Sequence, residues 1–100
     1  MKMYVAGQIT GDKNYKEKFR NASRKLIKCG YEVFSPAVLP NYPDVSHEDY
    51  MHICKAMIDV CDAVYFLKDW QQSEGAKVEF DYAREKGKFR YFEIGDDKKL

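Results

Sequence analysis

The sequence predicts an α/β fold in which a parallel sheet is covered by helices on both faces. Short apolar runs alternate with amphipathic segments at helical spacing, in the order β-α-β-α-β-α-β. The runs are continuously apolar rather than alternating, which is typical of strands buried on both faces of a parallel sheet. With 100 residues we expect one domain, placed at residues 1–95 and followed by a polar tail at residues 96–100.

Glycine residues mark the ends of the first strand and of the helix that follows it. Residues 3–6 form an apolar strand that Gly7 ends. Residues 13–29 are predicted to be helical, and Gly30 ends this helix before the second strand at residues 31–34. The apolar face of the helix consists of Tyr15, Phe19, Ala22, Leu26 and Cys29.

The middle of the chain is predicted to be a long loop, a second helix and a third strand. Residues 36–45 hold three prolines, and a loop of this length often covers a site. Ser46 and Asp49 have the spacing of a capping box, so the second helix begins there. Residues 63–67 are the most strand-like segment. The apolar face of the second helix consists of Tyr50, Ile53, Cys54, Met57, Ile58 and Cys61.

The last part of the chain repeats the pattern. Ser73 begins a third helix, Gly87 ends it, and residues 89–94 form a last strand. In parallel sheets of this kind, ligands bind beyond the carboxyl ends of the strands. That rule points to the three segments that follow the strands, at residues 7–12, 35–45 and 68–76.

Composition favours a small molecule as the partner. The net charge is +1 and both signs are scattered along the chain, which argues against a nucleic-acid surface or a membrane-binding face. No secretory signal precedes the first strand, so we expect a cytoplasmic protein.

Neither the cysteines nor the histidines suggest a metal or a cofactor. The three cysteines show no CxxC spacing, and we expect Cys29, Cys54 and Cys61 to be buried, reduced thiols. His47 and His52 have no third ligand in view, so we predict no metal site and no cofactor.

The loop after the first strand is the first candidate site. Glycines here let the backbone approach a ligand closely, and its N–H groups can face an anion or a sugar hydroxyl. A plain strand-to-helix turn explains the same residues, and the local sequence does not decide between the two. The candidate residues are Gly7, Gln8, Ile9, Thr10 and Gly11.

Glu79 is the second candidate. On a helical wheel, Ala76, Phe80 and Ala83 form the arc that faces the sheet, and Glu79 lies on the flank of that arc. Burying a carboxylate costs free energy unless a partner or a function requires it. The alternative is a flank residue that reaches solvent. Gly75, one turn earlier, leaves open space above Glu79 for a ligand.

The start of the third helix supplies further candidates. Ser73 caps the helix, whose free N–H groups suit hydroxyl or phosphate oxygens, and an ordinary cap is the alternative. Trp70, at the carboxyl end of the third strand, is a candidate for stacking on a base, although a hydrophobic plug is equally ordinary.

Three motifs together carry a family resemblance. They are Tyr4-Val5-Ala6-Gly7, Cys61-Asp62-Ala63-Val64 and Ser73-x-Gly75-x-x-x-Glu79-x-x-x-Ala83. In this combination the chain resembles the nucleoside 2-deoxyribosyltransferase-like superfamily over about residues 2–94. That superfamily contains nucleoside 2-deoxyribosyltransferases, 2'-deoxynucleoside 5'-monophosphate N-glycosidases and many short members, which this chain is most similar to.

The resemblance implies a flavodoxin-like three-layer sandwich with a parallel sheet of four to five strands. It also implies an enzyme that cleaves the N-glycosidic bond of a 2'-deoxynucleoside or its 5'-monophosphate, by hydrolysis or transfer. Glu79 is then the covalent nucleophile and Tyr4 its hydrogen-bond partner. The first loop, Ser73 and Gly75 are then ligand contacts.

Three departures from the superfamily pattern matter. Cys54 stands where many relatives have an aspartate, and a thiol does not replace that carboxylate as an acid at neutral pH. The alternative function is therefore a protein that binds a nucleotide or nucleoside derivative without catalysis. Thr10 replaces an arginine of the nucleotide hydrolases, and Glu74 adds a negative charge, which both argue against a 5'-monophosphate.

Two structural expectations follow. The first loop, the start of the third helix and Glu79 should line one cleft, because both loops follow strands at the same sheet edge. A homodimer is expected because the chain has 15% aromatic residues and relatives commonly build the site at a dimer contact. Met57, Tyr50 and Trp70 are the expected interface residues, and light scattering measures the mass.

Overall fold

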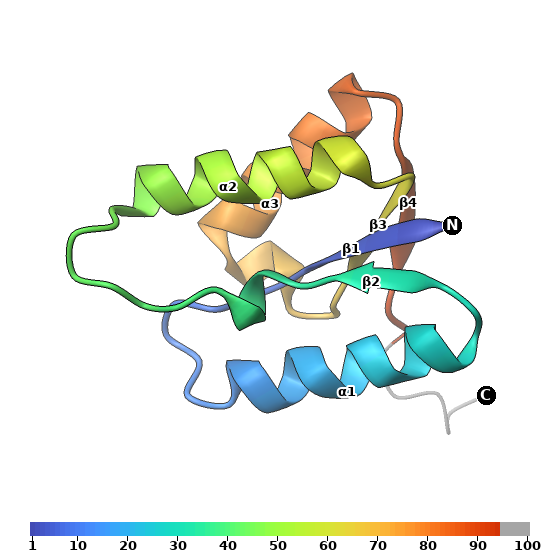
Figure 1. Cartoon of the computed structure of the whole chain (residues 1–100), viewed down its shortest axis with the longest axis horizontal. Coiled ribbons are helices and arrows are strands. Elements are labelled where there is room, and N and C mark those ends of the chain that lie inside the picture. Colours follow the sequence, from blue (N-terminus) through green and yellow to red (C-terminus); the bar gives the residue numbers. More distant parts are fainter. Residues whose placement is uncertain (95–100) are drawn as a thin grey trace.

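The fold is a four-stranded parallel sheet with an α-helix between each pair of successive strands (Figure 1). A computed structural model describes residues 1–94, so the polar tail at residues 96–100 lies outside the described residues. The strand order is β2-β1-β3-β4, and every neighbouring pair is parallel. The elements are β1 (Lys2–Ala6), α1 (Tyr15–Lys28), β2 (Glu32–Phe34), η1 (Pro36–Val38), α2 (His47–Val60), β3 (Ala63–Phe66), η2 (Trp70–Gln72), α3 (Glu74–Glu85) and β4 (Phe89–Phe92).

The helices form two layers, with α1 on one face of the sheet and α2 and α3 on the other (Figure 1). Alternate residues of β1 supply the two cores, because successive side chains of a strand point to opposite faces. Met3 and Val5 pack with Phe19 of α1, whereas Tyr4 and Ala6 pack on the α2 and α3 side. This arrangement confirms the predicted flavodoxin-like three-layer sandwich, with four strands.

The residues that were predicted to begin and end the helices make the expected contacts. The Ser46 hydroxyl accepts a hydrogen bond from the Asp49 N–H, and the Asp49 carboxylate accepts one from the Ser46 N–H. Gly30, just after α1, has a φ of 95°, a conformation that L residues with side chains rarely adopt. The predicted element boundaries therefore hold to within two residues for all three helices.

Several packing expectations were wrong in detail. Cys54 and Cys61 are buried as expected, whereas Cys29 is exposed, because it is the C-cap residue just past the last helical residue, Lys28. Ile53 is 41% exposed, because α2 buries only a narrow stripe of which Cys54 and Ile58 are the fully covered members. The segment after β2 is not wholly irregular, since it includes η1.

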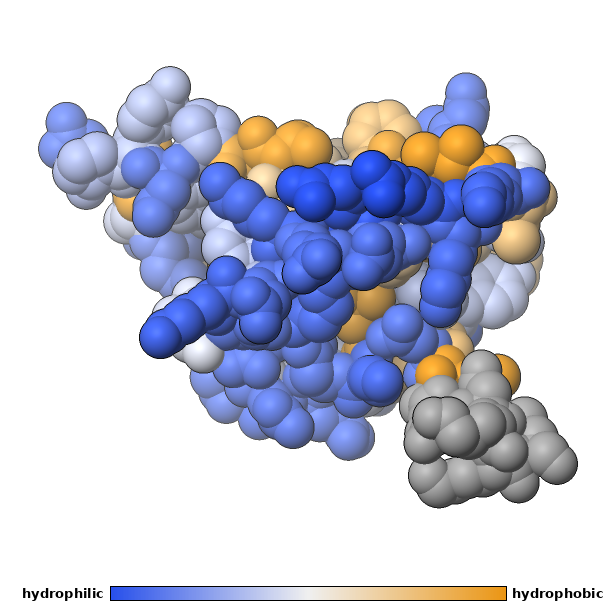
Figure 2. Space-filling model, turned by 90° about the horizontal axis from the view of Figure 1, so that it is seen from below, coloured by the Kyte–Doolittle hydropathy of each residue, from blue (hydrophilic) through white to orange (hydrophobic). Residues whose placement is uncertain are grey.

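The two outer regions of the molecule differ in polarity. The face seen from the α1 side is largely hydrophilic (Figure 2), because α1 carries many charged residues beside its apolar face. Large apolar side chains are exposed instead on the edge strand β4, where Phe89, Tyr91 and Phe92 are each at least 43% exposed. Within residues 1–94, none of the helices is both long and apolar enough to cross a bilayer.

Candidate active site

A cleft of ≈ 730 Å³ opens at the carboxyl ends of β1 and β3, and we call it the Glu79 cleft. The chain crosses from β1 over one face of the sheet and reaches β3 over the other, so this is the point where ligands bind in such folds. The lining residues come from β1 and the loop after it, the start of α1, η1 and its loop, α2, and the start of α3. The three predicted segments therefore meet in one cleft.

Tyr4 and Glu79 form the floor of the Glu79 cleft. The Tyr4 hydroxyl donates a hydrogen bond of 2.7 Å to Glu79 Oε2. Tyr4 is fully buried and Glu79 is 5% exposed, so the solvent alternative for this carboxylate was wrong. The buried arc of α3 is Ala76, Glu79 and Ala83, with Phe80 half-buried at its side. Glu79 is thus central to the arc that faces the sheet.

Burial controls the protonation of this floor. Desolvation raises the pKa of Glu79 from 4.5 to about 7, although hydrogen bonds from Tyr4 and Cys54 act in the opposite direction. Burial, and then the nearby Glu79 charge, raises the pKa of the Cys54 thiol to about 11. The same two causes raise the pKa of Tyr4 well above its ordinary value. At neutral pH, Tyr4 and Cys54 are therefore hydrogen-bond donors to a carboxyl group that is partly ionised.

This arrangement suits nucleophilic or acid–base chemistry. Every buried side-chain nitrogen and oxygen atom of the described residues has a hydrogen-bond partner, and Glu79 obtains its partners from neutral donors rather than from a cation. A carboxylate without a neutralising cation retains its charge for a ligand with a developing positive charge. A titrating group in a cleft is a frequent mark of an active site.

The predicted first loop lies at the cleft only in part. Gly7, Ile9 and Thr10 line it, whereas Gln8 and Gly11 do not. Gly7 also has a packing reason, because a Cβ there would approach Leu67 Cδ1 to 2.7 Å. Gly11 has a φ of 86° and forms a turn. The turn interpretation therefore holds for Gly11, while ligand binding by Gly7, Ile9 and Thr10 stays a prediction.

A charged bridge that sequence reasoning missed holds this loop in place. The Lys18 amine contacts the carboxylates of Asp12 and Asp69, and Asp69 Oδ1 also accepts a hydrogen bond of 3.2 Å from the Gln8 N–H. These contacts join the loop after β1 to the loop after β3. Gln8 therefore positions the cleft through its backbone, although its side chain lies outside. Asp69 could have been identified because it lies in the segment that follows the carboxyl end of the buried strand β3.

The start of α3 forms one wall of the Glu79 cleft. Ser73 caps the helix by accepting a hydrogen bond of 3.1 Å from the Ala76 N–H. Gly75 faces α2, since a Cβ there would lie 3.4 Å from Met51 Sδ and 3.7 Å from His47 Cε1. A side chain at position 75 would thus project between the two helices, into the space above Glu79.

Trp70 does not line the cleft, so its predicted contact with the ligand is corrected. Its ring stacks on Phe80 with the centroids 4.8 Å apart and an angle of 18° between the planes. It also lies against Phe66 at 5.2 Å and Phe92 at 6.0 Å. We call these four residues the aromatic cluster. Trp70 is the hydrophobic plug that the sequence left as the alternative, because its ring packs against residues of α3, β3 and β4.

Several further cleft residues were not singled out from the sequence. They lie on a predicted loop and on helix starts, where only the rule about strand ends pointed to them. Their shared character is apolar or aromatic with a few uncharged polar groups. The additional lining residues are Tyr15, Pro36, Leu39, Pro40, Asn41, His47, Tyr50, Met51 and Gln72.

The expected dimer residues have contacts within the chain. The Tyr50 hydroxyl donates to the Pro40 carbonyl and accepts from the Tyr42 N–H, and Met57 packs against the buried core. The homodimer stays a prediction. Among residues 1–94, no group of three or more histidine, cysteine and acidic side chains gathers as metal ligands would.

The fold and the cleft define a flavodoxin-like α/β protein with a buried glutamate in a cleft at the carboxyl edge of its sheet. A family model described as "Domain of unknown function (DUF4406)" matches residues 1–90, and the chain belongs to this family. No curated protein matches the chain.

Proposed function

We propose that the protein cleaves the N-glycosidic bond of a 2'-deoxynucleoside or its 5'-monophosphate through a covalent intermediate on Glu79. The observation that carries this proposal is the buried Glu79 carboxylate on the floor of the cleft, hydrogen-bonded by Tyr4. A deoxyribosyl cation-like transition state needs a nearby carboxylate without a competing cation. Glu79 meets that requirement.

The resemblance to the nucleoside 2-deoxyribosyltransferase-like superfamily supports the proposal. The matching positions Tyr4, Gly7, Ser73, Gly75 and Glu79 all line the same cleft. They come from distant parts of the sequence, since Tyr4 and Glu79 are 75 residues apart. These five residues were selected because they match the motifs, and folding brings them together. One shared chemistry explains this better than five unrelated structural roles.

The reaction has two displacements. A Glu79 carboxylate oxygen bonds to the anomeric carbon while the carbon–nitrogen bond breaks, and the bonding electron pair leaves with the base, which takes a proton from water. Water, or the nitrogen of a second base, then attacks the same carbon, gives its proton to the hydroxide left by the first step, and releases the Glu79 carboxylate. The first acceptor gives hydrolysis and the second gives transfer. Tyr4 holds the attacking carboxylate through its hydrogen bond.

The walls of the cleft fit a nucleoside. The rings of Tyr15 and Tyr50 and the side chains of Leu39 and Met51 offer apolar surface for a base, and the volume of ≈ 730 Å³ lies in the range of small-molecule sites. Uncharged polar groups at the rim suit sugar hydroxyls.

A panel assay tests the proposal. The four common 2'-deoxynucleosides and their 5'-monophosphates are incubated with the protein, and free base is measured by chromatography. We expect release of base from at least one of them. Ribonucleosides are the comparison compounds for the 2'-deoxynucleosides, because their additional 2'-hydroxyl withdraws electrons from the developing cation. Absence of base release from every compound would contradict the proposal.

Cys54 favours a second candidate, a protein that binds a nucleotide or nucleoside derivative without cleaving it. The thiol lies beside Glu79, and its pKa of about 11 makes it a poor proton donor to a leaving base. A ligand-induced rise in melting temperature without base release would select this candidate. Gain of base release in Cys54→Asp would then identify a scaffold that lacks its second carboxylate.

A further inference from the structure

The charge of the Glu79 cleft is one-sided. No lysine or arginine of residues 1–94 lines it, whereas two carboxyl groups do, Glu74 at the rim and Glu79 on the floor. The remaining polar lining groups are uncharged hydroxyls and amides or the imidazole of His47. An anionic ligand would therefore meet like charges and no fixed cation.

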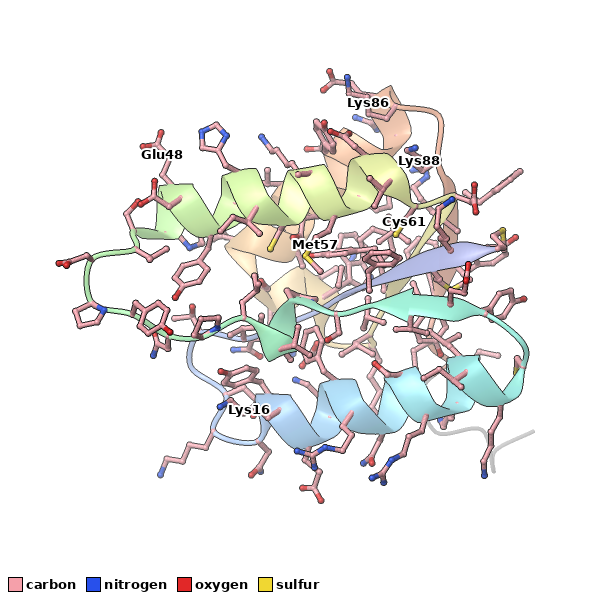
Figure 3. All side chains as sticks on the ribbon, viewed as in Figure 1. Lys16, Glu48, Met57, Cys61, Lys86 and Lys88 are labelled. Carbon is pink, nitrogen blue, oxygen red and sulfur yellow. The ribbon has the colours of Figure 1, made fainter. Side chains whose placement is uncertain are left out.

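The lysines close in sequence to the lining residues do not line the cleft themselves. The Lys18 amine contacts both Asp12 and Asp69, which lie in the loops after β1 and β3. Lys77 pairs with Glu74 at 3.0 Å near the start of α3. Lys86 and Lys88 lie at the far end of the molecule from the loops that border the cleft (Figure 3). Neither Lys13 nor Lys16, which are exposed near the start of α1, lines the cleft.

The start of α3 does not replace the missing cation. Its helix dipole favours anions, but Ser73 already occupies the Ala76 N–H. Glu74, whose exposed carboxylate pairs with Lys77, adds a further acidic group to the first turn. A phosphate monoester carries a charge of about −1.5 to −2 at neutral pH, so it would face the Glu74 and Glu79 carboxyl groups with only a partly occupied helix end to attract it.

We infer that the Glu79 cleft takes an uncharged 2'-deoxynucleoside and discriminates against the 5'-monophosphate of the same nucleoside. The inference rests on the proposed function, of which it selects one of two substrate classes. The hydroxyls of Thr10 and Ser73 and the amides of Asn41 and Gln72 can pair with the sugar 5'-hydroxyl and with base edges. None of these groups compensates a dianion.

Paired measurements test the inference. Each 2'-deoxynucleoside and its 5'-monophosphate are compared in kcat/KM for base release and in Kd by calorimetry, the latter with brief, cold titrations. We expect the nucleoside to be favoured by about tenfold or more in both, and the ratio to shrink as salt screens the charges. A monophosphate that is cleaved or bound as well as its nucleoside overturns the inference while leaving the proposed function intact.

The binding data distinguish a failure of the proposed function from a failure of the inference. If no compound releases base, the proposed function fails, and the Kd ratio alone decides the inference. A nucleoside that binds about tenfold more tightly than its monophosphate then supports it. Equal binding, tighter binding of the monophosphate, or no binding of either compound at millimolar concentration overturns it.

Glu74→Gln localises the cause to the cleft. Removing this exposed rim charge also frees Lys77 from its ion pair. The change should lower the Kd of the monophosphate relative to the nucleoside by about two- to threefold, a small factor because solvent screens both side chains. Glu48→Gln is the matched control, since it removes the same charge from the first turn of α2, where Glu48 points away from the sheet (Figure 3). A ratio that Glu48→Gln changes as much as Glu74→Gln overturns the inference.

Discussion

Two neighbouring residues of α3, Glu79 and Phe80, face regions built in opposite ways. Phe80 belongs to the aromatic cluster, where its ring lies 4.8 Å from Trp70 and 5.5 Å from Phe66, with Arg90 over its face. Glu79 is a buried carboxyl group on the floor of the Glu79 cleft, with open space above it. The rings of the aromatic cluster pack against one another, whereas the side chains of the Glu79 cleft surround a volume that a ligand can occupy.

The difference separates the stability of the protein from its proposed chemistry. Ring packing in the aromatic cluster stabilises the join between α3 and β4. The buried carboxyl group of Glu79 destabilises the fold whenever it is ionised. Substitutions in the cluster should therefore lower stability, whereas substitutions in the cleft should lower activity and leave stability equal or higher.

Glu79→Gln should have the largest effect on activity. The amide keeps the shape of the side chain but cannot form the glycosyl ester, so turnover should fall by at least about 10³-fold, or roughly 4 kcal/mol of barrier. Base release under saturating substrate measures this loss.

Asp81→Asn is the matched control for Glu79→Gln. Asp81 lies two residues further on α3, is exposed and pairs with Arg84 at 3.3 Å. Its substitution should change turnover little. Wild-type turnover in Glu79→Gln would show that the proposed nucleophile is wrong.

Phe66→Ala should have the largest effect on stability. Phe66 is fully buried and touches the other three rings of the aromatic cluster, so its removal leaves a cavity. We expect a loss of about 3–4 kcal/mol in the free energy of unfolding, measured by urea titration. The exposed Phe89→Ala is the control and should cost much less. Similar losses for both would contradict the role of the cluster.

Stability should depend on pH through Glu79. Its pKa rises from 4.5 to about 7 on folding, so the unfolded chain releases this proton first as the pH increases. The contribution of Glu79 to stability is therefore complete below pH 4.5 and is lost, by about 3 kcal/mol, as the pH rises to about 7. Glu79→Gln should abolish this part of the pH dependence and be more stable than wild type at pH 8. Parallel pH profiles for the two proteins would refute the assignment.

Tyr4→Phe should have the smallest effect. Losing the hydroxyl removes one donor to Glu79, which raises the pKa of Glu79 further and should lower turnover about tenfold. Because the carboxylate is the nucleophile, activity should increase with pH, and the rise should shift to higher pH in Tyr4→Phe. Phe34→Leu, a partly buried core substitution on the neighbouring strand, controls for packing and should leave the position of the rise unchanged.

The sequence predicted the fold better than the site, for physical reasons. Caps such as Ser46 and apolar runs such as residues 3–6 act locally, so the order of elements can be inferred without tertiary contacts. The hydrogen bond between Tyr4 and Glu79 was expected from the resemblance, whereas burial of Glu79 depends on how α2 closes over α3. The direction of the Trp70 ring depends on η2, which leaves no periodic signal.

The bridge from Lys18 to Asp12 and Asp69 shows the same limit. Lys18 and Asp69 are separated by 51 residues, and each member of the bridge has the appearance of an ordinary surface charge in the sequence. Only the sheet topology brings the two loops together. Long-range polar contacts of this kind have no spacing rule, so sequence patterns do not predict them.

The most direct test of the central claim is to identify the covalent intermediate. A 2'-deoxynucleoside whose 2' carbon carries fluorine slows the second displacement, because fluorine destabilises the cation-like transition state. The protein is quenched in acid after reaction and digested with trypsin, and the fragment of residues 78–84 is sequenced by mass spectrometry. We predict a fluorodeoxyribosyl group on Glu79 and none on Asp81. Release of base with the sugar attached to another residue, or to no residue, would contradict the account.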